Sequence, residues 1–183
     1  TGRPGPVLID IPKDLVDPNN PASQFEDYDP TGHNLPGYNP ITEPDPLKIQ
    51  EAVELILRSE RPVIYSGGGI LKARAATQLR ELAELLDVHV VTTLMNRGGF
   101  PDNHPLALGM PGMHGNYTAV TVLQEADLLI TLGARFDDRV TGRLDGFAPD
   151  AKIIHADIDP AEFNKVRFAD VSIQGDVGKT ITE

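Results

Sequence analysis

The sequence contains no cysteine and no tryptophan, and only 5% of its 183 residues are aromatic. Without cysteine the chain has no disulfide, no thiolate ligand for a metal and no cysteine nucleophile. Basic residues are also scarce: 16 Lys and Arg stand against 27 Asp and Glu, for a formal net charge of −11. Such a chain lacks the basic face that nucleic acid requires, and anionic membrane surfaces repel it. We therefore expect neither nucleic acid nor membranes among its partners.

Long hydrophobic runs are missing as well. No apolar stretch approaches the roughly 18 residues that a membrane span needs, and the N-terminus lacks the basic and then apolar pattern of a signal peptide. The lack of cysteine fits a reducing compartment, so we expect a cytoplasmic protein, or an organellar one in a eukaryote. With 40% hydrophobic residues, the chain can still bury a substantial core.

The first 45 residues differ in kind from the rest. Val7–Ile11 is typical of a short strand between prolines, and we interpret residues 1–15 as the end of a preceding domain. Residues 16–45 contain six prolines among many Asn, Asp and Gly, which predicts an extended linker. The compact domain is expected over residues 46–183. The start without methionine and a helix that begins at the last residues suggest a piece of a longer protein.

Residues 46–183 alternate between helical and strand patterns. Asp45 followed by Pro46 is typical of a helix start, and apolar residues then recur at helical spacing. Strands are predicted at 62–66, 88–92, 126–132, 152–156 and 171–173, helices at 46–59, 75–86, 117–125 and 160–167, and loops at 100–115 and after Arg139. This order predicts an α/β fold, with a doubly wound, mainly parallel, Rossmann-like sheet and helices on both of its faces.

Five strand ends carry residues that suit a ligand. The carboxyl ends of parallel strands share one edge of the sheet, and ligands bind beyond that edge. Glycines there can offer backbone N–H groups to phosphate, and an aspartate can accept hydrogen bonds from ribose hydroxyls. The five ends are Gly67–Gly69, Thr92–Met95, Gly133–Arg135, Asp157 and Gly175–Asp176. Together they predict a cleft for an elongated nucleotide.

The segment 126–140 is the most informative of the five. Its apolar run stops at Gly133, and four charged residues follow: Arg135, Asp137, Asp138 and Arg139. Arg135 and Arg139, with Arg3, can neutralise a diphosphate in this acidic chain. Asp137 and Asp138 are adjacent, so they point apart on any regular element and form a poor acid–base pair. For this segment alone, solvated charges after an ordinary strand are an equally good interpretation.

Other candidates have simpler structural interpretations. Gly67–Lys72 begins like a dinucleotide fingerprint, but Lys72 stands where the third glycine should be, so it is not a standard NAD loop. Tight turns alone account for such glycines. Asp157 and Asp159 are candidate metal ligands, although an aspartate before Pro160 more often caps a helix. We therefore predict no metal site.

The five histidines show no spacing typical of a metal site. His89 and His155 fall inside predicted strands and are expected in the core. His114 lies in a glycine-rich loop and is the better candidate for a ligand contact. The sequence has no Gly-x-Ser-x-Gly elbow and no P-loop. The residues therefore predict a binding domain without catalytic residues of its own.

Several motifs resemble one enzyme family. Gly2–Asp14 is similar to the end of the pyrimidine-binding domain of thiamine-diphosphate enzymes. Gly67–Gly69, Pro111–Gly115 and above all Gly133–Gly142 resemble the central part of acetolactate (acetohydroxyacid) synthases, and the resemblance extends over essentially the whole chain. It implies a central domain that binds FAD without using it for redox catalysis in the main reaction.

The resemblance also implies what the complete enzyme does. Such an enzyme condenses two pyruvates, or pyruvate and 2-oxobutyrate, to a 2-acetohydroxy acid with release of CO₂, in branched-chain amino-acid biosynthesis. Its catalytic glutamate and its site for thiamine diphosphate and Mg²⁺ lie in other domains, so we expect the present chain alone to be inactive. The implied partners are these domains, further copies in a homodimer or tetramer, and a regulatory small subunit.

The family's FAD contacts can be transferred by matching motifs. They are Arg3, Gly67, Gly68, Gly69, Thr93, Leu94, Met95, Gly112, Met113, His114, Gly133, Ala134, Arg135, Asp137, Arg139, Val140, Asp157, Ile158, Gly175, Asp176 and Val177. Asp138 and Arg139 are similar to positions that line the family's substrate channel, where herbicides bind. Two alternatives stay open. One is the central domain of another thiamine-diphosphate enzyme, such as glyoxylate carboligase, with FAD or ADP. The other is an assembly domain with an empty cleft.

Overall fold

The computed structural model describes residues 2–19 and 40–183, and the chain divides into two compact units, Arg3–Pro40 and Ile41–Glu183. Within residues 2–19 the only regular element is the 3-10 helix η1 (Lys13–Val16). The strand predicted over Val7–Ile11 is not formed, and these residues are exposed. A strand needs a neighbour for its backbone N–H and C=O groups. The predicted linker falls largely on residues 20–39, outside the described residues.

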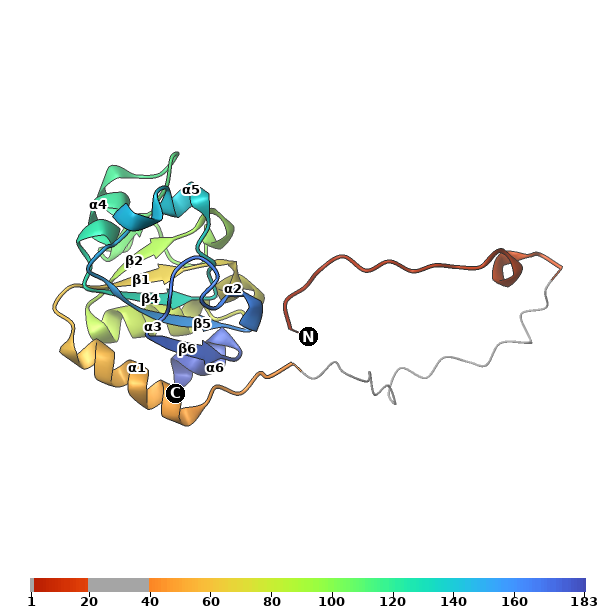
Figure 1. Ribbon diagram of the computed structural model, residues 1–183, viewed down its shortest axis with the longest axis horizontal. Helices are drawn as coiled ribbons and strands as arrows, with labels where there is room; N and C mark the ends of the chain where they lie inside the picture. Colours follow the sequence, from red (N-terminus) through yellow and green to blue (C-terminus); the bar gives the residue numbers. More distant parts are fainter. Residues whose placement is uncertain (1, 20–39) are drawn as a thin grey trace. The chain divides into compact units, whose positions relative to one another are not determined.

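The second unit is built on a six-stranded parallel sheet in the order β3-β2-β1-β4-β5-β6 (Figure 1). The strands are β1 (Pro62–Ser66), β2 (His89–Thr92), β3 (Ala107–Gly109), β4 (Leu128–Leu132), β5 (Lys152–Asp157) and β6 (Val171–Gln174). This confirms the predicted α/β fold. The order reverses between β1 and β4, and such a reversal marks the ligand crevice of open α/β sheets.

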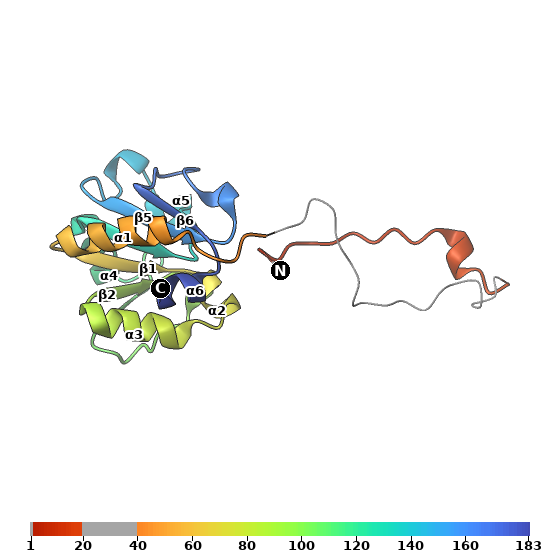
Figure 2. The same cartoon turned by 90° about the horizontal axis from the view of Figure 1, so that it is seen from below.

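Helices cover both faces of the sheet. They are α1 (Pro46–Arg58), α2 (Gly68–Lys72), α3 (Ala76–Leu86), α4 (Tyr117–Glu125), α5 (Asp138–Thr141) and α6 (Val177–Thr182). One core joins α1, α2, α3 and α6 to one face, through residues such as Ile64 and Leu79, while the other joins α4 to the opposite face through Leu123 and Leu129. Figure 2 shows α3 on one side of the sheet and α5 on the other.

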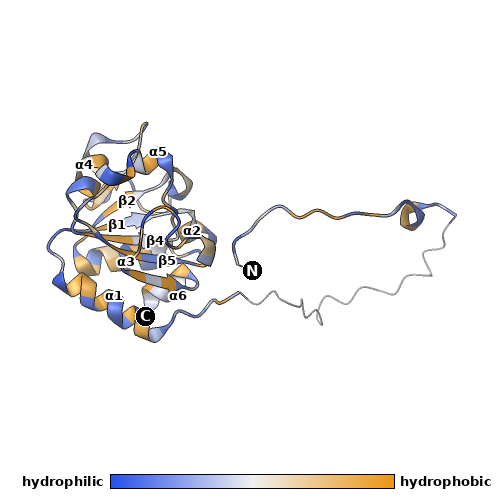
Figure 3. Ribbon diagram, viewed as in Figure 1, coloured by the Kyte–Doolittle hydropathy of each residue, from blue (hydrophilic) through white to orange (hydrophobic). Residues whose placement is uncertain are grey.

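Local sequence explains the best-predicted elements. Asp45 caps α1 as predicted, since its Oδ1 accepts a hydrogen bond from the Leu47 N–H at 2.9 Å. Hydrophobic and hydrophilic residues alternate along α1 in Figure 3, and Ala52 on its inner face is buried. All five residues of β4 are buried, which fits a central strand covered on both sides.

Several stretches differ from the prediction, among them Gly68–Lys72, which forms α2 although no helix was predicted there. The loop expected over 100–115 contains the short edge strand β3, and the loop expected after Arg139 contains α5 and the 3-10 helix η4 (Leu144–Gly146). The helix expected over 160–167 is limited to the 3-10 helix η5 (Pro160–Glu162). Elements of three or four residues are too short for a hydrophobic period to reveal them. Within the described ranges, no helix has the length and apolarity needed to cross a membrane.

Asp127 ties two turns together at the amino edge of the sheet. Its carboxylate accepts hydrogen bonds from the backbone N–H groups of Glu60 at 2.7 Å and Arg61 at 2.9 Å. We expect Asp127→Ala to lower the free energy of unfolding by about 2 kcal/mol, because two bonds to a charged acceptor are lost. Asp127→Asn keeps one acceptor oxygen and should cost roughly half as much. Urea denaturation of both variants measures this, and equal stability of Asp127→Ala and the unaltered chain would contradict it.

Candidate functional site

The predicted strand ends lie level with one another along the carboxyl edge of the sheet. The residue after each of four strands donates its N–H to a carbonyl at or next to the end of the neighbouring strand. The bonds are Thr93 N–H to Ser66 O (2.9 Å), Gly67 N–H to Leu132 O (2.9 Å), Gly133 N–H to Ala156 O (2.8 Å) and Gly175 N–H to Asp157 O (3.1 Å). This geometry brings together five segments that are far apart in sequence, as the sequence predicted.

The turns after β1 and β4 are in direct backbone contact. The Gly69 N–H donates to Gly133 O at 2.9 Å. A Cβ atom added at Gly67 would lie 2.3 Å from Gly133 O, and one added at Gly69 would lie 2.6 Å from Gly133 Cα. Gly133 itself has φ of +56°, a conformation that disfavours other residues. These glycines therefore permit the two turns to meet at the point where the strand order reverses.

This contact corrects one sequence-based expectation. Glycine N–H groups were expected to face phosphate, but those of Gly67, Gly69, Gly133 and Gly175 donate to carbonyl groups of the chain itself. These N–H groups are used because neighbouring strand ends are joined by backbone hydrogen bonds. A sequence pattern does not reveal such bonds. At these four positions the glycines serve close packing.

Two further contacts extend the edge on either side. A Cβ at Gly68 would lie 3.1 Å from Met95 Cβ, so the turn after β1 borders the segment after β2. Gly112 has φ of +96°, and a Cβ there would lie 2.6 Å from Arg139 O, which brings the loop after β3 against α5. Together with the contact of Gly67–Gly69 and Gly133, these segments form a continuous row. We call this row, together with the ends of β5 and β6 at Asp157 and Gly175–Val177, the carboxyl edge.

The charged residues after β4 are largely open to solvent. Arg135 Nη2 lies 3.3 Å from Asp137 Oδ2, and 56% of the Arg135 side chain is exposed. Asp137 also caps α5 by accepting the Arg139 N–H at 3.1 Å. The Arg139 and Asp138 side chains are 76% and 82% exposed, at 4.0 Å from each other. Two guanidinium groups are therefore available beside the carboxyl edge, with Asp137 orienting the first.

Apolar side chains are also exposed at this edge. Leu94 and Met95 follow β2, Met113 follows β3, and each is about 70% exposed. His114, beside Met113, is exposed as well. Ala134 and Val177 are buried, at 4% exposure each, so little of either residue is open to a ligand. Ile158 and Val140 are half-buried.

The aspartates at the edge of β5 and β6 have structural partners. Asp159 caps η5 through the Ala161 N–H at 3.0 Å, in agreement with the capping interpretation. Asp157 Oδ1 accepts the Asp159 N–H at 2.9 Å, and Asp176 caps α6 by accepting the N–H groups of Gly178 and Lys179. Among the described residues, no group of three or more His, Asp or Glu is placed to hold a metal ion. Arg3 lies in the first unit, and its role stays a prediction.

The two strand histidines differ in environment. His89 is exposed at the start of β2, so its predicted place in the core is wrong. An apolar pattern locates a strand but does not show which of its end residues other elements cover. His155 is fully buried, as predicted. Its Nε2 lies 2.8 Å from Ala134 O. A carbonyl oxygen only accepts hydrogen bonds, so Nε2 carries the proton. Sequence reasoning missed this contact because it joins residues 21 positions apart.

Burial of His155 makes stability depend on pH. Desolvation lowers the pKa of His155 below its ordinary value of 6.5, although its hydrogen bond to Ala134 and the nearby carboxylates of Asp157 and Glu162 act in the opposite direction. The unfolded chain then binds the proton more readily than the folded one. The stabilising contribution of neutral His155 is therefore complete above pH 6.5 and is lost as the pH falls toward the lower folded pKa.

We therefore expect the free energy of unfolding to fall from pH 7 to pH 5, and to fall less steeply in His155→Gln, which has no imidazole to protonate. Urea denaturation at a series of pH values measures both slopes. A slope unchanged by the substitution would show that His155 does not contribute to the pH dependence.

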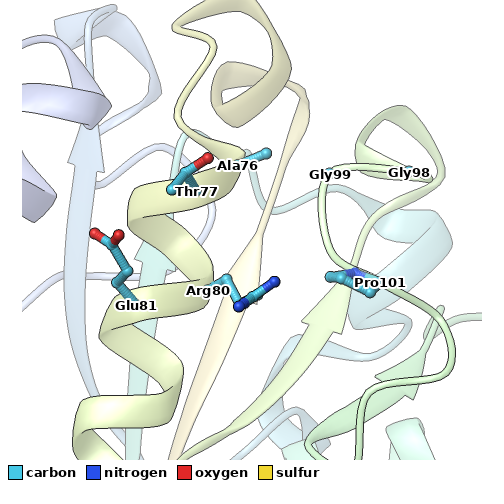
Figure 4. Close-up of a pocket in the computed structure, with 7 residues that line it drawn as sticks. All are labelled: Ala76, Thr77, Arg80, Glu81, Gly98, Gly99 and Pro101. Atoms are coloured by element: carbon cyan, nitrogen blue, oxygen red, sulfur yellow. The ribbon is translucent and has the colours of Figure 1, made fainter.

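A separate pocket of about 280 Å³ lies beside α3. Figure 4 shows Ala76, Thr77 and Arg80 along α3 opposite the segment Gly98–Pro101; Glu81 completes the lining. None of these residues belongs to the predicted site. Its lining includes the pair Gly98–Gly99, and a glycine pair in a sequence indicates a turn and not a pocket.

Residues 49–183 match the family model described as "Thiamine pyrophosphate enzyme, central domain". Curated relatives match the whole length. The chain is 57% identical over 183 residues to "Acetolactate synthase" of Mycobacterium bovis, with 100% of this chain and 29% of the relative covered. It is 52% identical over 181 residues to "Acetolactate synthase large subunit" of Corynebacterium glutamicum, with coverage of 99% and 28%.

A more distant organism gives a comparable match. The chain is 50% identical over 183 residues to "Probable acetolactate synthase large subunit" of Methanocaldococcus jannaschii, covering 100% of this chain and 31% of the relative. The chain thus spans somewhat under a third of the length of these relatives.

Proposed function

Because the chain belongs to the family of thiamine pyrophosphate enzyme central domains, we propose that its carboxyl edge binds FAD. The observation that carries this proposal is the meeting of two glycine turns where the strand order reverses between β1 and β4. Ligands of open α/β sheets bind outside this point. The turns after β2 and β6 and the loop after β3 extend the edge on either side of this point.

The side chains at the edge suit the two ends of FAD. Arg135 and Arg139 are exposed cations in a chain of net charge −11, and guanidinium groups pair well with diphosphate. Leu94, Met95 and Met113 are exposed apolar groups that a flat flavin ring can cover, and methionine adapts readily to such a ring. In this proposal Asp157 accepts from ribose hydroxyls, and the flavin carries no redox step of the main reaction.

The wider role follows from the relatives. We infer that the chain serves as the central part of an acetolactate synthase large subunit, whose other domains bind thiamine diphosphate and Mg²⁺ and condense two pyruvates, or pyruvate with 2-oxobutyrate. In this role the chain contributes cofactor binding, while Asp138 and Arg139 border the substrate channel. Association into a homodimer or tetramer, a regulatory small subunit and sensitivity to herbicides belong to the same proposal.

Calorimetric titration with FAD, ADP and NAD tests the binding proposal. We expect saturable binding of FAD, weaker binding of ADP, which lacks the flavin, and no binding of NAD, because Lys72 replaces the third fingerprint glycine. Equal affinities for ADP and FAD would favour a domain that holds ADP. Failure of all three nucleotides would favour the assembly domain without a ligand.

A further inference from the structure

His155 makes a contact that core packing does not require. Its ring lies between Phe136 and Phe163, at centroid distances of 5.5 and 5.2 Å with edge-to-face geometry. A phenylalanine or leucine would fill such a space without placing a polar atom in the core. Instead, the Nε2–H donates to Ala134 O at 2.8 Å. The acceptor belongs to the turn after β4, directly before Arg135.

The second ring nitrogen of His155, Nδ1, is buried without a hydrogen bond to any residue that the structure describes, so the presence of a histidine here is unfavourable for stability. Within residues 2–19 and 40–183, the buried Nδ1 atom has no hydrogen-bond partner. A buried acceptor without a hydrogen-bond partner destabilises the fold, because it has lost its bonds to water. Thr131, the residue opposite His155 on β4, also has a buried hydroxyl without a partner in the described part of the chain. The core thus tolerates polar atoms here while one imidazole nitrogen reaches the turn.

Three hydrogen bonds hold the turn after β4, at Gly133 and Ala134. Gly133 N–H donates to Ala156 O, Gly69 N–H donates to Gly133 O, and the His155 side chain binds the next carbonyl, that of Ala134. The first two bonds hold Gly133. Only the third acts on the peptide that joins Ala134 to Arg135, so it sets the direction in which Arg135 leaves the sheet.

We propose that His155 is a positioning residue of the nucleotide site: through its Nε2–H bond to Ala134 O it fixes the peptide from which Arg135 reaches the ligand's diphosphate. The inference rests on the proposed FAD site. His155 itself touches no ligand, because it is fully buried.

Three substitutions separate positioning from packing. His155→Gln places an amide N–H near the position of Nε2 and keeps the donor. His155→Asn places its amide near Nδ1, too short to reach Ala134. His155→Phe keeps an aromatic ring between Phe136 and Phe163 but removes the donor. We expect FAD affinity to fall about tenfold in the Asn and Phe variants, the equivalent of one hydrogen bond, and to stay within about twofold in the Gln variant.

Deuterium exchange provides a readout that does not depend on FAD. The backbone amides of residues 135–139 should exchange faster in His155→Phe than in His155→Gln, at conditions where urea denaturation shows both variants folded. Equal exchange and equal FAD affinity in these two variants would overturn the positioning role. If the unaltered chain binds no FAD, the proposed function fails, and the exchange rates alone decide whether His155 holds the turn.

Discussion

Gly67→Ala is expected to lower the free energy of unfolding by about 3 kcal/mol, at the upper end for a group added to a packed site. The new Cβ would lie 2.3 Å from Gly133 O and 2.4 Å from Ala134 Cα. Both are backbone atoms, so no side-chain rotation can relieve the overlap, and β1 and β4 must move apart. Gly133→Ala should cost at least as much, because its Cβ would meet Gly69 Cα at 2.7 Å and its φ is +56°.

Two other glycines provide matched controls. Gly142 combines φ of +55° with ψ of −127° and has nothing within 4 Å of an added Cβ, so Gly142→Ala isolates backbone strain and should cost about 2 kcal/mol. Gly146 is open and has no left-handed φ, so Gly146→Ala should be close to neutral. Urea denaturation of the four variants compares them directly. If Gly67→Ala were no more destabilising than Gly142→Ala, the close contact of the two turns would be contradicted.

The double substitution Arg135→Ala with Arg139→Ala is expected to weaken FAD binding by about 100-fold or more. In the proposed site each guanidinium offers a charge-assisted bond of roughly 1.5–3 kcal/mol to the diphosphate. Asp137 and Asp138 would remain, so the segment would change from balanced charge to two carboxylates facing an anion. Repulsion then adds to the lost bonds. The effect on folding stability should be small, because the side chains are exposed.

Arg58→Ala is the matched control for this loss of positive charge. Arg58 ends α1 just before β1, at the amino edge of the sheet, and pairs on the surface with Glu54 at 3.3 Å. Removal of the Arg58 charge should change FAD affinity by less than about twofold, since salt screens this charge between the amino edge and the carboxyl edge of the sheet. Calorimetry of the double variant and of Arg58→Ala provides the comparison. Equal losses in both would indicate a general charge effect and no diphosphate contact.

The sequence predicted those parts of the fold that depend on local patterns. Capping by Asp45 located α1, and the apolar run before Gly133 located β4. The alternation of strands and helices gave the parallel sheet. It could not give the strand order, because the adjacency of β1 and β4 is a contact between segments over 60 residues apart. The edge strand β3 has only three residues, Ala107–Gly109, and no detectable period.

The sequence predicts the candidate site as a set of strand ends. It does not predict which atoms of these residues are used in hydrogen bonds within the fold. The glycines at 67, 69 and 133 are recognisable as strand-end residues, yet their N–H groups bind neighbouring strands. Likewise, an apolar strand context suggests that His155 belongs to the core, and it does, but its bond to Ala134 depends on tertiary structure. Local sequence indicates where backbone can approach closely, while the fold determines which atoms meet.

An FAD site at the carboxyl edge is tested most directly by NMR, by following the backbone amide signals of the ¹⁵N-labelled chain during titration with FAD. We predict that the largest shifts occur along the carboxyl edge, at Gly68, Met95, Arg135, Arg139 and Val177. Little change is expected at Thr77, Gly98 and Gly99, which line the pocket beside α3. Shifts concentrated at that pocket, or no shifts at saturating FAD, would contradict an FAD site at the carboxyl edge.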